Sequence, residues 1–223
     1  MIHSPLVGPL TLMPLAVELR SRGFDVGVPD LRPALAEPRP QWQAILNLAT
    51  SVADVAAPDV IMGHSGAGAL LPLLADRVQA NVVAYVDAVV PGEGTHYEAS
   101  KEFIHFVDSL PREGSLLPPW HTWWGDDAIV RLLPDEELRR RIAADTPSVP
   151  RSLYDDPVPL PAGWMTRRWS CYLQLSPAYN DDRARAESYG WPADGMNGQH
   201  LDVAAKPADV VQLLIHIIDR ARN

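Results

Sequence analysis

The sequence predicts an α/β fold in one domain, with helices packed on a mostly parallel sheet. Valine-rich apolar segments such as residues 81–86 are typical of strands that are buried on both faces of such a sheet. These segments alternate along the chain with segments of helical periodicity, which is the order that parallel strands require. A length of 223 residues and a hydrophobic share of 47% fit a single globular domain with a substantial core.

The first half of the chain carries the regular alternation of strands and helices. Gly23 ends the first predicted helix, because glycine readily adopts the left-handed conformation found at helix ends. In chain order the pattern predicts a helix over residues 11–22, a strand over 24–29, a helix over 41–56, a strand over 59–63, a helix over 69–75 and a strand over 81–86.

The alternation stops between about Glu93 and Trp169, where prolines, tryptophans and short helical pieces replace it. An insertion of this length is too long for a loop, so we expect a helical cap over residues 93–169, after the strand over 81–86. The core is then formed by residues 1–92 and 170–223. After a charged helix over 135–144 inside the cap, the pattern predicts a strand over 170–175, a helix over 181–188, a short strand near Trp191 and a last helix over 207–222.

Composition limits the classes of partner and the compartment. A net charge of −9 argues against nucleic acids and anionic membrane surfaces as partners. The single cysteine, Cys171, cannot form an internal disulfide, so we expect a reducing, cytoplasmic location. The first residues contain prolines and Glu18 and lack a basic flank, which is unlike a secretory signal. No apolar stretch approaches the length of a membrane span.

The most informative motif lies at residues 59–68, where an apolar strand runs into a turn of small residues centred on Ser65. A helix follows at once, and a strand, a tight turn and a helix together raise one hydroxyl above the end of a sheet. The residues beside the serine must be small, and Gly63, Gly66 and Ala67 meet that demand. The alternative is a glycine-rich turn of an α/β protein in which the serine is incidental.

This motif resembles the nucleophile elbow of the α/β-hydrolase family, which reads G-x-S-x-G, with Ala67 in place of the last glycine. The family's order of elements, with a helical cap after the sixth strand, matches nearly the whole chain. The resemblance implies that Ser65 is a nucleophile and that a histidine in a loop before the last helix is its base. His200, which follows Gly198 and precedes the helix over 207–222, stands at that position.

The family's sheet usually begins with an antiparallel hairpin, and this sequence departs from that pattern. Residues 1–3 already match the end of the strand that precedes the family's His-Gly loop. We therefore expect either that the first two strands are absent or that the start codon is internal. A strand left at an uncovered sheet edge invites pairing with another chain, which gives the hypothesis of a homodimer formed through that edge.

Three assignments remain open for the acid that orients His200. Asp87 is favoured because an aspartate that closes an apolar strand needs a partner to offset its desolvation. The family more often places the acid after its seventh strand, near Ser176, where this chain has no carboxylate. Asp181 or Asp182, a few residues later, is the second assignment, and a dyad assisted by another group is the third.

The resemblance also implies an oxyanion hole, and here the match is incomplete. The backbone N–H of Gly66 is the expected first donor. The family's second donor falls on Pro5, which has no N–H, so we expect the N–H of Leu6 to donate, with the Ser4 hydroxyl as a further candidate. His3 matches a histidine that is structural in the family.

Aromatic residues of the cap are expected to set the substrate. Trp120, His121, Trp123 and Trp124 suggest a large, flat, apolar pocket wall suited to an aromatic, polyketide-like or acyl-chain group. The alternative for each tryptophan is that it packs the cap onto the core. His64, inside the elbow, is expected to point into the sheet packing and not at a substrate.

These observations predict a serine hydrolase that acts on a carboxylic ester, thioester or lactone with a bulky apolar part. Ser65, His200 and Asp87 would form the triad, and an acyl-enzyme would be the intermediate. No dinucleotide fingerprint, P-loop or metal-ligand spacing is present in the sequence, so no cofactor and no metal are expected. The alternatives are a lyase or cyclase of secondary metabolism that uses the same pair for proton transfer, and a non-catalytic ligand-binding protein on the same scaffold.

Overall fold

A four-stranded sheet of parallel strands forms the centre of the computed structural model, which describes residues 1–56 and 58–222. Neighbouring strands are paired in parallel, with Met62 opposite Ala84 and Ala84 opposite Cys171. This arrangement confirms the predicted α/β class with a parallel central sheet. The strands, in their order across the sheet, are β1 (Val60–Ser65), β2 (Val82–Ala88), β7 (Trp169–Gln174) and β8 (Ala193–Gly195).

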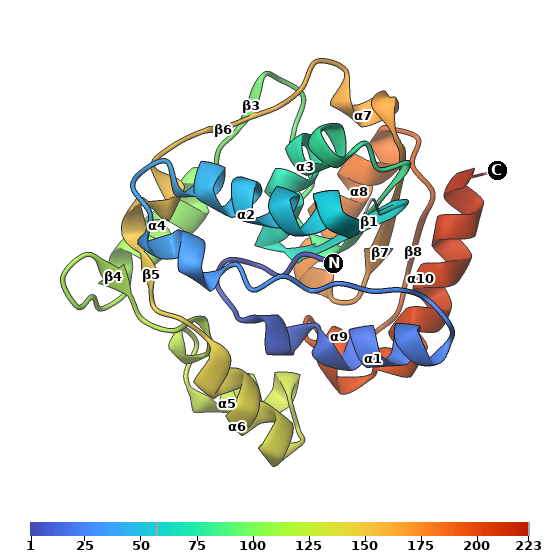
Figure 1. Ribbon diagram of the computed structural model, residues 1–223. Helices are drawn as coiled ribbons and strands as arrows, with labels where there is room; N and C mark the ends of the chain where they lie inside the picture. The colour runs from blue at the N-terminus through green and yellow to red at the C-terminus, as the bar shows by residue number, and fades with distance from the viewer. Residues whose placement is uncertain (57, 223) are drawn as a thin grey trace.

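Helices cover both faces of this sheet (Figure 1). One face packs against α2 (Gln41–Ala56), α3 (Leu71–Val78) and α8 (Asn180–Ser188). The other face packs against α1 (Met13–Ser21), α9 (Asp202–Ala205) and α10 (Pro207–Arg222). Short 3-10 turns named η1 (Pro9–Thr11), η2 (Arg32–Ala36), η3 (Gly66–Leu70) and η6 (Pro177–Tyr179) connect these elements.

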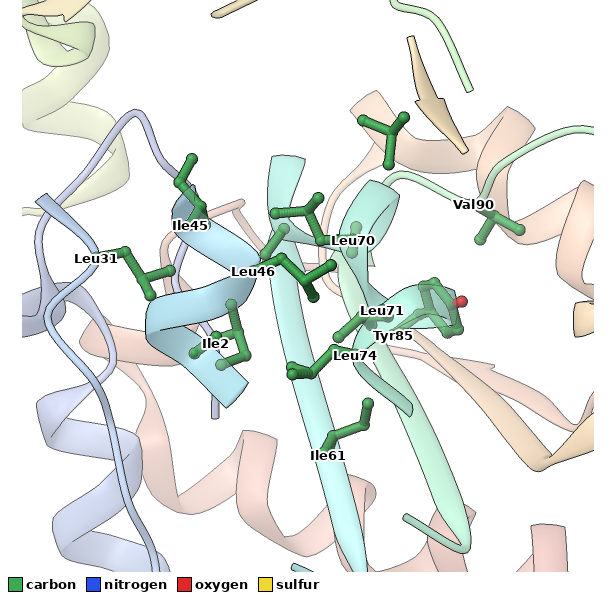
Figure 2. Packing of buried hydrophobic residues seen from close by; sticks show 14 of the residues in the cluster. Ile2, Leu31, Ile45, Leu46, Ile61, Leu70, Leu71, Leu74, Tyr85 and Val90 are labelled. Carbon is green, nitrogen blue, oxygen red and sulfur yellow. The ribbon is translucent and has the colours of Figure 1, made fainter. Parts of the chain in front are cut away.

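Successive side chains of each strand enter opposite layers, because side chains of a β-strand alternate between its two faces. Ile61 and Tyr85 belong to the cluster formed with α2 and α3, and Figure 2 shows both gathered with Leu71 and Leu74. Met62, the neighbour of Ile61, belongs to the cluster formed with α1 and α10. The strands are therefore apolar on both faces, which explains the continuous apolar runs in the sequence.

The chain between β2 and β7 holds two small antiparallel sheets, each formed by two short strands far apart in the sequence, and several short helices. Two of the helices, α5 and α6, stand away from the sheet (Figure 1) and pack on Leu201 and Ala204, next to the His200 loop. The limits 93–169 proposed for a cap stay a prediction. The elements of the stretch are β3 (His96–Tyr97), α4 (Lys101–Ser109), β4 (Leu116–Leu117), η4 (Trp120–Thr122), α5 (Asp126–Leu132), α6 (Glu136–Asp145), β5 (Val149–Pro150), η5 (Arg151–Tyr154), β6 (Val158–Pro159) and α7 (Trp164–Arg167).

Asp145, the last residue of α6, ties this helix to the N-terminal part of the chain. Its carboxylate accepts the backbone N–H of Leu10 at 2.8 Å and is paired with the Arg32 guanidinium at 2.6 Å. A Cβ on Gly8 would lie 2.1 Å from an oxygen of the same carboxylate, so only glycine allows this close approach. The loop over residues 8–10 is thereby fastened to α6.

The predicted strand over residues 24–29 is wrong, because this segment has no regular structure. A strand needs a paired neighbour of several residues. Beside this segment lies Met1, whose ammonium group donates to Gly27 O at 2.7 Å. Ile2 makes a single parallel bridge to Gly63 of β1, so the edge of β1 is covered at one point. Homodimer formation through this edge stays a prediction.

None of the helices in the described residues has both the length and the apolar character that crossing a membrane would require.

Gly68 allows η3 to approach the chain after β2, and replacing it should be costly. A Cβ there would lie 2.0 Å from the backbone oxygen of Val89, which cannot move away as a flexible side chain would. We expect Gly68→Ala to lower the free energy of unfolding by about 2 kcal/mol or more, or to prevent folding. Gly92→Ala, where nothing lies within 4 Å of the added Cβ, should change it by less than about 0.5 kcal/mol. Urea unfolding of both variants checks this, and equal midpoints would contradict the close approach.

Candidate active site

Ser65 occupies a strained turn at the carboxyl end of β1. Its backbone has φ 60° and ψ −132°, and the pairing with β2 shifts register between His64 and Ser65. A positive φ is uncommon for a residue with a side chain, and such strain is found at functional sites. Gly66 follows and begins η3, so its N–H lies at the N-terminal end of that turn. The strand, the tight turn at Ser65 and the helical turn that the motif predicted are therefore present.

The Ser65 hydroxyl hydrogen bonds to the phenol of Tyr179, with 3.1 Å between Oγ and Oη. The Tyr179 ring is stacked on the His200 imidazole, with centroids 5.0 Å apart and planes inclined by 13°. Burial raises the pKa of Tyr179, so the phenol is neutral at neutral pH. Sequence reasoning missed this residue. Its position shortly after β7 could have pointed to it, since ligands of open α/β sheets bind at the carboxyl ends of the strands.

His200 and Asp87 are directly hydrogen bonded, with 2.8 Å between Nδ1 and Oδ2. Asp87, the last residue but one of β2, has φ 42° and is completely buried. Its Oδ1 accepts the backbone N–H groups of Leu175 and Ser176 at 2.8 and 2.9 Å. Its Oδ2 also accepts the Ser176 hydroxyl at 2.6 Å. Ser176 thus stands where the family more often has its acid, and it contacts the carboxylate of Asp87.

The hydrogen bonds around Asp87 decide its charge. Burial by itself raises the pKa of this carboxyl, but the bonds and charge of His200 and the bonds from Ser176 outweigh it and hold the pKa below its usual range. An ionised Asp87 accepts a proton-bearing Nδ1, and Nε2 of His200 is then left as the nitrogen that can take up a proton. This is the geometry of an oriented general base.

The two other acids weighed for this role lie elsewhere. Asp182 accepts the backbone N–H of Val90 at 2.8 Å and lies 3.9 Å from Arg185. Asp181 is exposed at the start of α8. The structure therefore brings Asp87, and not these residues, to Nδ1 of His200.

His64 is buried behind His200 and supports it. The two rings are stacked with centroids 4.4 Å apart, and Nε2 of His64 lies 2.9 Å from the backbone oxygen of His200, to which it donates. Burial, together with the charge of His200, lowers the pKa of His64 to about 3. A neutral imidazole therefore fills this position at physiological pH. The role expected from the sequence, packing and not substrate contact, agrees with this place.

The loop that carries His200 is fixed by Asp202, which is almost fully buried. Its carboxylate accepts the backbone N–H of Gln199 at 3.0 Å and is paired with Lys206 at 3.1 Å. A Cβ on Gly198 would lie 2.2 Å from the same carboxylate, which explains the glycine two residues before the histidine. His200 is thus set by a rigid loop.

The loop after His3, which is expected to complete the oxyanion hole, approaches Gly66 through Ser4. His3 is buried and structural, since its Nε2 accepts the Leu31 N–H at 3.1 Å and its Nδ1 donates to Ser4 O at 2.8 Å. The N–H of Leu6, expected to serve as the second donor, is directed at the hydroxyl of Ser4, 3.3 Å away.

The aromatic residues of η4 and the following turn have different surroundings. The ring centroids of Trp120 and His200 are 6.0 Å apart, so the structure brings Trp120 to the site. Trp123 is buried, and its indole N–H donates to Pro118 O at 2.8 Å. Trp124 is 50% exposed and stacks on Phe106. His121, also expected at the substrate pocket, lies between these residues in η4 and is half-buried.

Within residues 1–56 and 58–222, no group of three or more histidine, cysteine, aspartate or glutamate side chains is placed to hold a metal ion.

The buried neutral His64 makes stability sensitive to acid. The unfolded chain binds a proton at this histidine near pH 6.5, whereas the folded chain does so only near pH 3. Stability should therefore fall as the pH drops through this window, on the order of 1 kcal/mol for each pH unit below 6.5. His64→Gln keeps a donor for His200 O but cannot titrate, so its free energy of unfolding should fall less between pH 7.5 and 5. Urea unfolding at both pH values measures the difference, and parallel losses would refute this origin of the acid sensitivity.

The fold of the whole chain is similar to that of several known proteins. No family model and no curated protein matches the sequence. Among solved structures, an extracellular α/β-hydrolase from a Paenibacillus species superimposes with a TM-score of 0.70, at 15% identity over 97% of this chain and 96% of that one. Tomato methylketone synthase I, complexed with 2-tridecanone, gives 0.71 at 12% identity over 99% and 96%. A pyrethroid hydrolase gives 0.68 at 14% identity over 100% and 98%. This chain therefore has the α/β-hydrolase fold.

Proposed function

We propose that this protein is a serine hydrolase in which Ser65 is the nucleophile, His200 the general base and Asp87 the group that orients His200. The hydrogen bond between His200 and a buried, ionised Asp87 is the observation that carries this proposal. It occurs beside a serine held in a strained turn at the carboxyl end of a parallel strand. The hydrolases among the structural neighbours support the assignment at the level of the fold.

The reaction would proceed by acyl transfer to water. The Ser65 hydroxyl turns from Tyr179 to Nε2 of His200, which takes its proton as Oγ attacks the carbonyl carbon. The N–H of Gly66 stabilises the negative oxygen that forms. His200 then gives its proton to the departing alcohol, thiol or ring oxygen, which leaves an acyl group on Ser65. Water, deprotonated by His200, attacks this acyl-enzyme. His200 then returns the proton to Ser65 Oγ as the bond to the acyl group breaks, which releases the acid and restores the site.

The proposed substrate class rests on the aromatic side chains that lie close to His200. Trp120 presents an aromatic ring near His200, and the ring of Tyr179 lies against the imidazole. Flat apolar walls of this kind suit a carboxylic ester, thioester or lactone with a bulky apolar part.

A second candidate is proton-transfer chemistry in a lyase or cyclase that forms no acyl-enzyme. The hydrogen bond of Ser65 to Tyr179 favours it, since it places a phenol, a hydroxyl and an imidazole around one point. One of the structural neighbours is named as a synthase, the tomato methylketone synthase I, and not as a hydrolase.

A fluorophosphonate separates these candidates, because it labels only an activated serine. We expect the intact mass of the wild-type protein to gain one adduct and that of Ser65→Ala to gain none. The unlabelled wild type should also hydrolyse simple p-nitrophenyl esters, and labelling should abolish this activity. A folded wild type that gains no adduct would contradict the hydrolase proposal and leave proton transfer or ligand binding.

The identity of the acid can be tested with two matched variants. Asp87→Asn removes the charge that orients His200, so the rate of fluorophosphonate labelling should fall on the order of a thousandfold or more. Asp182→Asn removes a carboxylate that lies near the site but accepts a backbone N–H, so the labelling rate should stay close to that of the wild type. Thermal unfolding of both variants controls for misfolding. A larger loss in Asp182→Asn would refute Asp87 as the orienting acid.

A further inference from the structure

The proposed reaction needs two donors for the oxygen that becomes negative, and the backbone supplies one of them. The N–H of Gly66 follows the nucleophile and is the first donor. The next donor would come from the loop after His3, but Pro5 has no N–H. The N–H of Leu6 is directed at the Ser4 hydroxyl. A second donor must therefore come from another group.

Ser4 is held in place by both its neighbours and its burial. Its side chain and backbone are 2% exposed, and its carbonyl oxygen accepts Nδ1 of His3 at 2.8 Å and the N–H of Val7 at 3.1 Å. The nearby Ile2 is bridged to β1. Ser4 is thus preorganised beside the turn that carries the nucleophile, and an oxyanion donor acts best when it needs no rearrangement.

The Ser4 hydroxyl lies beside Gly66, the residue whose N–H is the first donor. A Cβ built on Gly66 would be 3.2 Å from Ser4 Oγ, which is tight for a side-chain contact. The glycine after the nucleophile leaves room for this hydroxyl, so Ser4 Oγ stands next to the residue that follows Ser65.

The direction of the hydrogen bond at Ser4 leaves its proton available. Leu6 N–H donates to Oγ, so Oγ is an acceptor in that bond. A hydroxyl has one proton and two lone pairs, and the proton remains to be donated. Accepting one bond also strengthens the bond that a hydroxyl donates. In this way the Leu6 N–H acts through Ser4.

We infer that the Ser4 hydroxyl is the second oxyanion donor of this site and that Leu6 is a positioning residue behind it. The inference rests on the proposed hydrolase function and names a further catalytic residue for it. Ser4 replaces the backbone donor that Pro5 lacks.

The first test compares rates of fluorophosphonate labelling, since this reaction also develops charge on an oxygen. Ser4→Ala should label about a hundredfold more slowly than the wild type. Ser4→Thr keeps the hydroxyl and should recover part of the rate. Ser170→Ala, a matched loss of a buried serine hydroxyl in β7, should label at the wild-type rate. The intrinsic tryptophan fluorescence of each variant reports whether it is folded.

A crystal structure of the wild-type adduct gives a second readout that needs no variant. The phosphonyl oxygen should lie within hydrogen-bond distance of both Gly66 N and Ser4 Oγ. An oxygen held by Gly66 and another group, or a folded Ser4→Ala that labels as fast as the wild type, would overturn the inference while leaving the hydrolase proposal intact. A wild type that forms no adduct would instead overturn the hydrolase proposal and this inference with it.

Discussion

The buried carboxylate of Asp87 is the group on which the candidate site depends. A fully buried charge without partners costs several kcal/mol, so the surrounding donors are required for the fold as well as for the proposed chemistry. Those donors come from the chain after β7 and from the His200 loop. The ends of β2 and β7 and the loop before α9 can therefore be correctly formed only together. The same bonds give His200 its tautomer and direction.

His200 is enclosed on both faces. His64 stacks on one side of its ring and Tyr179 on another, with Trp120 near it as well. A neutral His64 adds no charge to the site, and its bond to the backbone of His200 fixes the loop from behind. In the structure the Ser65 hydroxyl is already hydrogen bonded to the phenol of Tyr179. In the proposed reaction, a substrate must therefore compete with this phenol for the Ser65 hydroxyl before His200 can act on it.

Much of this arrangement was predictable from residue patterns that have a local cause. The buried strands, the turn around Ser65 and the glycine before His200 follow from side-chain size and periodicity. Asp87 could be singled out because an acid that closes an apolar strand needs a partner. The segment 24–29 shows the limit of pattern alone, since alternating residues form a strand only when another strand lies beside them. The position of Tyr179 after β7 places it at the carboxyl end of the sheet. Its bond to Ser65 and the contact of Ser4 with Gly66, however, depend on which distant segments meet, and no spacing in the sequence encodes that meeting.

The carboxylate of Asp145 gives the molecule a mechanical connection between two of its parts. It joins the end of α6, in the stretch between β2 and β7, to Leu10 and Arg32. Leu10 closes the loop that begins at Ser4. A bulky molecule that pushes α6 outward must break these bonds or pull the loop along with the helix. Any outward movement of α6 is thus coupled to the position of the loop that contains Ser4.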